Sequence, residues 1–275
     1  MTMLGIKEIR ELQKNGKARR TQGLFIVEGI KMFRETPRER ISQVCVSESF
    51  LKDHADEVDG LLGEGLSARL SEADSVRLKD GTGVMRLSDS RMKTLSDTRS
   101  PQGILLAVRK REWEIDAILD KDAPFLILLE NVQDPGNLGT IVRTAEAAGA
   151  DGVFMTEGCA DIYNPKVIRS TMGSIYRVPH CVIGGTTDLL TRFLERDIIS
   201  YAAYLDTEIS YLDGDYKKGT CFFIGNESRG LSDELLNQSD RLIHIPMKGQ
   251  VESLNAAMAA GILMFEAARQ RAQKQ

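Results

Sequence analysis

A strand–turn–helix–strand pattern in the middle of the chain constrains the fold more than any other feature. Pro124–Leu129 is a nearly uninterrupted apolar run, which is typical of a strand buried on both faces. Turn-forming residues follow at 131–137, and residues with helical spacing then run from Leu138 to Ala148 and end at a glycine. Gly152–Met155 is predicted to be the next strand. Because a helix joins the two strands, we expect them to lie parallel in one sheet.

The rest of the chain extends this pattern into an α/β protein with two domains. After residue 155, four strands and a long closing helix are predicted at Val178–Val182, Ile198–Tyr204, Thr220–Ile224, Arg241–Ile245 and Ser253–Arg271. The first part of the chain alternates between helix and strand, with a helix at 5–14, a basic loop, a strand at Leu24–Val27 and a short helix at 84–94. We therefore expect a smaller α/β domain at 1–110, a charged linker at 111–121, and a parallel-sheet domain at 122–275.

Composition argues against several classes of protein. The longest uninterrupted apolar run, Ala256–Phe265, is too short to cross a bilayer, which takes about 20 residues. The N-terminus lacks the apolar core of a secretory signal. The four cysteines lie far apart without a C-x-x-C pair, and the three histidines form no H-E-x-x-H motif. We therefore expect a cytoplasmic protein with no membrane contact, no disulfide framework and no bound metal.

The net charge of −4 is unevenly distributed along the chain. Residues 1–110 carry 20 Lys and Arg against 16 Asp and Glu, a net charge of +4, whereas residues 111–275 carry 16 against 24, a net charge of −8. The densest basic cluster consists of Lys14, Lys17, Arg19 and Arg20. Such a cluster suits the phosphates of a nucleic acid, although a solvated helix end has the same composition.

Three polar loops follow predicted strands in the second domain, where ligands of parallel sheets usually bind. They span Asn131–Arg143, Ile224–Leu231 and Ile245–Asn255. The first loop contains only Gly136-x-x-Gly139 of the dinucleotide fingerprint G-x-G-x-x-G, and no Walker A sequence occurs. These loops therefore give little support to a site for NAD or for a nucleoside triphosphate.

Taken together and in this order, the three loops resemble the signature motifs of the SpoU (TrmH-like) family of RNA ribose 2′-O-methyltransferases, in the SPOUT superfamily. The matching motifs are N-x-G-x-x-x-R at Asn137–Arg143, G-N-E-x-x-G at Gly225–Gly230 and I-P-M-x-G-x-x-x-S-L-N at Ile245–Asn255. The resemblance covers about residues 124–271. It implies a parallel-sheet domain whose C-terminal segment threads through a loop and forms a trefoil knot.

Two N-terminal stretches, Arg19–Gly29 and Asp97–Ile104, resemble the substrate-binding domain common in this family, which is like ribosomal protein L30e. The resemblance implies an N-terminal domain that recognises structured RNA, with ribosomal RNA favoured over transfer RNA. The basic cluster of Lys14, Lys17, Arg19 and Arg20 is the predicted contact surface.

The resemblance also implies S-adenosyl-L-methionine as the cofactor and assigns residues to its site. Gly225, Ile245, Met247 and Leu254 match positions that hold the cofactor, although the three apolar residues also suit a core. The predicted catalytic residues are Asn137, Arg143, Glu227, Ser253 and Asn255. Ser253 could equally cap the closing helix. In the family, the arginine that matches Arg143 is proposed to be a base. Because an arginine is effectively always protonated, the alternative role for Arg143 is to bind the target phosphate and polarise the 2′-hydroxyl.

The family resemblance implies a homodimer through residues 253–271. The small-residue stripe of Ala256, Ala260, Leu263, Met264 and Ala267 suits close helix packing between subunits or within one subunit. The leading functional hypothesis is a 23S rRNA 2′-O-methyltransferase. The alternatives are a tRNA 2′-O-methyltransferase, a thiopeptide-resistance enzyme of the same layout, and a non-catalytic RNA-binding factor for ribosome assembly.

Overall fold

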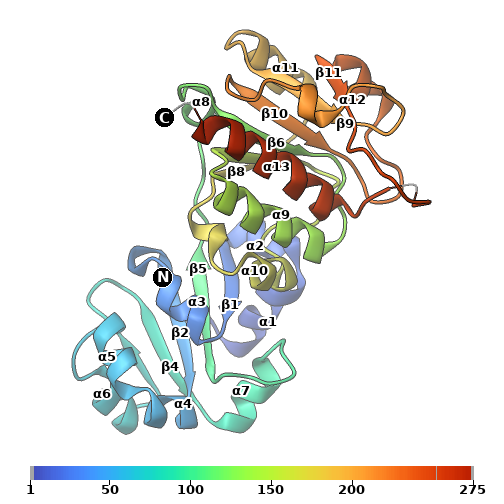
Figure 1. The fold of residues 1–275 in the computed structure, drawn as a ribbon. Helices are drawn as coiled ribbons and strands as arrows, with labels where there is room; N and C mark the ends of the chain where they lie inside the picture. Colours follow the sequence, from blue (N-terminus) through green and yellow to red (C-terminus); the bar gives the residue numbers. More distant parts are fainter. Residues whose placement is uncertain (1–2, 252, 274–275) are drawn as a thin grey trace. The chain divides into compact units, whose positions relative to one another are not determined.

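The computed structural model describes residues 3–251 and 253–273, and it divides the chain into two compact units (Figure 1). The first unit extends to Arg111 and also contains Tyr163–Tyr176, whereas the second contains Glu112–Ile162 and the residues from Arg177 onward. The segment Tyr163–Tyr176 lies inside the predicted second domain but packs with the first unit. The reason is aromatic packing, because the Tyr163 and Phe25 ring centroids lie 4.7 Å apart.

The second unit is built on six parallel strands in the order β11-β9-β10-β6-β7-β8. The strands are β6 (Phe125–Leu129), β7 (Gly152–Thr156), β8 (His180–Ile183), β9 (Ile199–Ala203), β10 (Thr220–Ile224) and β11 (Arg241–Ile243). Strand β10 is inserted between β6 and β9, so the loops that follow β6 and β10 leave the same sheet edge side by side. This crossover brings distant motifs of the sequence together.

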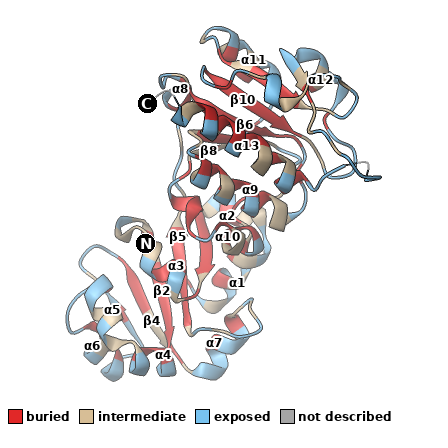
Figure 2. Cartoon of the chain, in the orientation of Figure 1, coloured by how far each residue is buried: buried red, intermediate tan, exposed pale blue. Residues whose placement is uncertain are grey.

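Helices cover this sheet because its central strands are apolar on both faces. Every residue of β6 and β10 is buried, and Figure 2 shows both strands in red. The helices of the unit are α8 (Ile115–Leu119), α9 (Pro135–Ala148), α11 (Thr186–Leu194), α12 (Asp233–Gln238) and α13 (Ala256–Ala272), with a 3-10 turn at Tyr211–Asp213. Helix α13 packs against α9 and β10.

The first unit contains a mixed five-stranded sheet in the order β1-β5-β2-β4-β3. Its strands are β1 (Leu24–Glu28), β2 (Ile41–Ser47), β3 (Ser75–Arg77), β4 (Gly83–Leu87) and β5 (Ile104–Arg109). Only β2 and β4 pair in parallel; the other neighbours are antiparallel. The helices are α1 (Ile6–Lys14), α2 (Gly16–Gln22), α3 (Ile30–Glu35), α4 (Glu48–Asp53), α5 (Ala55–Leu62), α6 (Leu66–Glu72), α7 (Asp89–Leu95) and α10 (Pro165–Thr171), with 3-10 turns at Arg38–Arg40 and Ser174–Tyr176.

Two local predictions were wrong. The basic segment after α1 is the helix α2 rather than a loop, because the Asn15 side chain accepts hydrogen bonds from the backbone N–H groups of Lys17 and Ala18 and so caps the helix. The predicted helix at 84–94 is strand β4 followed by α7, since Ser88 caps α7 and separates the two elements. Both errors arise where a single cap residue sets the boundary.

The structure also corrects the predicted RNA-contacting role of Arg19. Its side chain is only 3% exposed, and its Nη1 donates to the backbone carbonyls of Leu12 (2.7 Å) and Gln13 (3.0 Å) at the end of α1. Arg19 therefore stabilises the junction of α1 and α2 and does not present its charge to solvent. Lys14, Lys17 and Arg20 are exposed.

Replacing Arg19 should therefore destabilise the first unit locally. We expect Arg19→Ala to cost about 2 kcal/mol, because two hydrogen bonds from a charged donor to backbone carbonyls are lost. Hydrogen–deuterium exchange at α1 measures this change. Arg20→Ala is the matched control, and equal protection of α1 in the two variants would contradict the structural role of Arg19.

The described part of the chain contains no helix long and apolar enough to cross a membrane.

Candidate functional site

The loops at the carboxyl edge of the second sheet surround a cavity of about 380 Å³. Its walls come from the segments after β9, β10 and β11 and from the start of α13. All four residues predicted to hold the cofactor line this cavity, namely Gly225, Ile245, Met247 and Leu254. Residues from two separate sequence motifs therefore share one ligand-sized space.

Gly225 begins a turn in which no larger residue fits. A Cβ atom added there would lie 2.2 Å from the carbonyl carbon of Gly230 and 2.3 Å from the nitrogen of Leu231. The turn closes because Asn226 and Gly230 exchange two backbone hydrogen bonds, each of 3.0 Å. The motif thus needs its first glycine for close approach of two backbone segments.

A chain of hydrogen bonds joins the three loops. Asn137 at the start of α9 donates from Nδ2 to Glu227 Oε1 (2.9 Å). Its Oδ1 accepts from Nδ2 of Asn255 (2.9 Å). The Oδ1 of Asn255 in turn accepts from the backbone N–H groups of Ala257 and Met258 and caps α13. One predicted catalytic residue from each motif takes part in this chain.

The carboxylate of Glu227 sets the direction of the whole chain. A carboxylate only accepts, so the amide of Asn137 must present its NH₂ to Glu227 and its oxygen to Asn255. Glu227 also accepts from the backbone N–H groups of Asp134 (3.2 Å) and Gln133 (3.4 Å). Both asparagine side chains are thereby held in a single orientation.

The pKa of Glu227 is lowered. Partial desolvation alone would raise the pKa, but hydrogen bonds from Asn137 and from the backbone favour the ionised carboxylate and outweigh it. Glu227 is therefore anionic at neutral pH. This state suits a residue that holds neighbouring donors in place, and it makes Glu227 a weak proton acceptor.

The other two predicted catalytic residues do not take part in the hydrogen-bond chain. Ser253 lines the cavity but makes no hydrogen bond with another described residue, and it does not cap α13, because Asn255 does. Arg143 is exposed on α9 and does not line the cavity, and its side chain makes no hydrogen bond or ion pair within the described ranges. Its guanidinium is therefore available to an external anion.

The structure adds cavity residues that the sequence motifs did not reveal. Tyr204 and Leu205 follow β9, His244 directly precedes the third motif, and Arg229 occupies a variable position inside the second. The Nδ1 atom of His244 lies 3.0 Å from the carbonyl of Ile209, so this nitrogen carries the proton and donates. Applying the carboxyl-edge rule to β9 would have found Tyr204 and Leu205.

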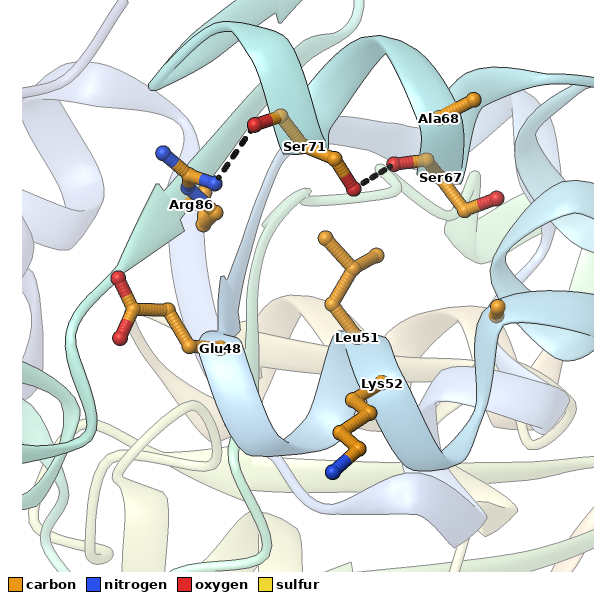
Figure 3. A pocket seen from close by; sticks show the side chains of 8 residues that line it. Glu48, Leu51, Lys52, Ser67, Ala68, Ser71 and Arg86 are labelled. Carbon is orange, nitrogen blue, oxygen red and sulfur yellow. Dashed lines mark hydrogen bonds between the residues drawn. The ribbon is translucent and has the colours of Figure 1, made fainter.

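A second cavity, of about 360 Å³, lies in the first unit and has no comparable features (Figure 3). Two of its polar side chains are already engaged, since Arg86 donates to the backbone carbonyl of Ser71 and the Ser71 hydroxyl donates to the backbone carbonyl of Ser67. Arg86 also pairs with Asp74. We therefore place the candidate functional site at the second-unit cavity. Among the described residues, no group of three His, Cys, Asp or Glu could hold a metal ion.

Comparison with known protein families identifies both parts of the chain. Residues 124–265 match the model of the SpoU rRNA Methylase family, and residues 5–106 match that of the MRM3-like substrate binding domain. The predicted N-terminal substrate-binding domain is therefore confirmed. The chain is also 31% identical over 211 residues to the 23S rRNA (guanosine(2553)-2′-O)-methyltransferase of Bacillus subtilis, a match that covers 75% of this chain and 83% of that protein.

Solved structures show the same architecture. The AdoMet-bound rRNA methyltransferase of Sinorhizobium meliloti is 28% identical, with a TM-score of 0.78 over 96% of this chain and 94% of that one. A SpoU methyltransferase of Streptomyces viridochromogenes, in complex with AdoMet, has a TM-score of 0.80 at 24% identity over 97% of each chain. These similarities confirm the predicted α/β fold with a parallel sheet. On the family match and the Bacillus similarity, the chain belongs to the SpoU rRNA methylase family.

Proposed function

We propose that this protein is an S-adenosyl-L-methionine-dependent RNA ribose 2′-O-methyltransferase. The observation that carries the proposal is that two motif loops line one cavity and that the chain from Glu227 through Asn137 to Asn255 joins both of them to the third loop. Membership of the SpoU family supports the same reaction.

The cavity residues fit the proposed cofactor. Ile245, Met247 and Leu254 offer apolar surface for a purine ring, and the tight turn that begins at Gly225 lines the same cavity. The volume of about 380 Å³ lies within the range of small-molecule sites. When bound, S-adenosyl-L-methionine supplies an electrophilic methyl group to the ribose 2′-hydroxyl.

Arg143 is the proposed residue for the RNA side of the reaction. It follows Asn137 by six residues on α9, a rise of roughly 9 Å, and a helical side chain points back toward the helix start. An exposed guanidinium without a described partner is suited to gripping a phosphate with two parallel hydrogen bonds. From that position its charge stabilises the oxygen as the hydroxyl passes its proton to water and takes the methyl group from the sulfonium.

Substitution of Arg143 tests this assignment. Arg143→Ala should abolish methyl transfer to RNA and leave S-adenosyl-L-methionine binding unchanged, because Arg143 does not line the cavity. Arg143→Lys keeps the charge but loses the planar fork, and we expect a loss of about 100-fold in rate. Transfer of a radiolabelled methyl group gives the rate, and calorimetry gives the affinity. Near-normal transfer by the alanine variant would remove Arg143 from the reaction.

Glu227 is the proposed positioning residue for Asn137. Glu227→Gln should weaken cofactor binding and slow transfer by about 10-fold, because the glutamine amide presents an N–H toward groups that all donate. Ser228→Ala, in the same turn, is the control, because the Ser228 side chain makes no hydrogen bond to another described residue.

The pH dependence of Glu227 follows from its lowered pKa. The hydrogen bonds that Glu227 accepts stabilise the site fully above the ordinary glutamate pKa of about 4.5. This stabilisation is lost as the pH falls through the lower pKa that Glu227 has in the folded protein. In the wild type, S-adenosyl-L-methionine affinity should thus decrease at acidic pH, and in Glu227→Gln this decrease should be smaller. Identical pH profiles would contradict the positioning role.

The proposed substrate is ribosomal RNA, most specifically 23S rRNA, and the proposed location is the cytoplasm. The support is the 23S rRNA activity in the name of the Bacillus relative, together with the substrate-binding domain at residues 5–106. Lys14, Lys17 and Arg20 remain proposed RNA contacts because their side chains are exposed on α1 and α2. Methylation assays on separated ribosomal and transfer RNA distinguish the two substrates.

We also propose a homodimer through α13, with a different surface from the one predicted. The small-residue stripe is buried within the unit itself; Ala260 and Leu263, for example, are each 1% exposed. By contrast, Met258 and Phe265 are 62% and 53% exposed and lie seven residues apart on one helix face. Large apolar side chains at this spacing are typical of a helix that packs against another chain.

Charged substitutions on this face should therefore separate the subunits. We expect wild-type protein to have twice the mass of the 30.5 kDa chain in light scattering. Met258→Asp with Phe265→Asp should give the mass of a single chain. A monomeric wild type, or a variant that stays dimeric, would contradict this interface.

A further inference from the structure

The stretch Asp97–Ile104, which the sequence analysis singled out, forms one wall of a groove in the first unit. The groove has a volume of about 410 Å³, and Arg99, Pro101, Gln102 and Gly103 line it. The opposite walls come from α4 and α7. A space of this size accommodates one nucleotide.

The loop that carries Arg99 is held rigidly. The carboxylate of Glu28 accepts hydrogen bonds from the hydroxyl groups of Ser96 and Thr98 and from the backbone N–H of Asp97. Farther along, Gln102 Oε1 accepts from the backbone N–H of Ile30 (3.0 Å). The wall is therefore built in advance and does not have to be ordered by a ligand.

The groove contains a fixed aromatic platform. The rings of Phe50 and His54 are stacked, with centroids 4.6 Å apart and an interplanar angle of 29°. His54 Nδ1 donates to Glu57 (3.1 Å), and Glu57 in turn accepts two hydrogen bonds from Arg34. Phe50 is buried, whereas the His54 side chain is 36% exposed. The His54 ring is therefore held in place by Phe50 and Glu57 and is partly exposed where it lines the groove.

The charges of the groove suit a nucleotide rather than a simple anion. Lys93 and Arg99 line it, are exposed, and make no side-chain hydrogen bond or ion pair with other described residues. Asp53 and Asp89 also line it, and Ser49 donates to Asp89 from its hydroxyl (2.6 Å) and its backbone N–H. Two cations and two carboxylates cancel, which disfavours free phosphate. A nucleotide offers a phosphate to the cations and base N–H groups to the carboxylates.

We propose that this groove binds one unpaired nucleotide of the RNA substrate, with its base stacked on His54 and its phosphate held by Lys93 and Arg99. The inference rests on the proposed function in that it takes RNA as the substrate. It adds a specific requirement, because a base can stack on a side chain only when it is not paired and stacked within a duplex. The first unit thus selects a single-stranded or looped-out position in the RNA.

Binding of the full-length protein to short RNA tests the proposal. The probes are a fluorescent single-stranded oligoribonucleotide and the duplex of the same sequence, measured by anisotropy at one fixed salt concentration. Lys93→Ala with Arg99→Ala should weaken single-strand binding by about 10-fold. The matched control is Arg69→Ala with Lys79→Ala, which removes the same charge from exposed positions of the first unit outside the groove. An equal loss in the control pair would overturn the site.

His54 gives the more specific test. His54→Ala should weaken single-strand binding by about 10-fold, whereas His54→Phe should restore it, because phenylalanine keeps the stacking surface. An oligonucleotide with 2-aminopurine should show a fluorescence change with the wild type and His54→Phe and none with His54→Ala. Unchanged binding by His54→Ala, or loss in both variants, would overturn the stacking role.

Calorimetry with S-adenosyl-L-methionine separates this proposal from the proposed function. All groove variants should bind the cofactor as the wild type does, because none of the groove residues lines the second-unit cavity. A wild type that binds no cofactor would overturn the methyltransferase proposal but leave the RNA measurements valid. A wild type that binds cofactor, with groove variants that bind RNA normally, would overturn the groove alone.

Discussion

The orientation of the site depends on one anion, the carboxylate of Glu227. It accepts hydrogen bonds from Asn137 and from two backbone N–H groups of the loop after β6, so it fixes which end of each amide faces which neighbour. Asn255 then transmits this orientation to the start of α13. A neutral side chain could not impose a single direction on amide groups that can each donate and accept.

The first unit uses a carboxylate for the same purpose. Glu28, at the end of β1, accepts from Ser96, Asp97 and Thr98 and so holds the loop that leads into the groove. In both units a glutamate carboxylate accepts hydrogen bonds from backbone N–H groups that find no backbone carbonyl partner in an irregular loop. The loops are therefore defined in shape although they belong to neither helix nor strand, and this is what permits them to carry binding residues.

The buried and exposed members of the basic cluster illustrate the limit of reading charge from sequence. Arg19 and Arg20 are adjacent and chemically identical, yet one guanidinium binds the carbonyls at the end of α1 while the other is exposed. The α13 stripe shows the same limit, because its small residues are buried within the unit and Met258 and Phe265 are exposed instead. Which face of a helix is covered depends on the elements packed against it, and a stretch of sequence does not contain them.

By itself, the sequence determined the strands of the second sheet, their parallel arrangement and the three motifs whose loops meet at the carboxyl edge of that sheet. It did so because a strand buried on both faces must be continuously apolar, and because turns after such strands have few possible compositions. Only the tertiary structure decided that Asn137, Glu227 and Asn255 are joined in one chain and that Phe50 and His54 stack beside Arg99. Phe50 and His54 are only four residues apart, but the hydrogen-bond chain and the placing of Arg99 in the same groove connect segments far apart in the sequence. The insertion of β10 between β6 and β9 brings the loops of the second unit together.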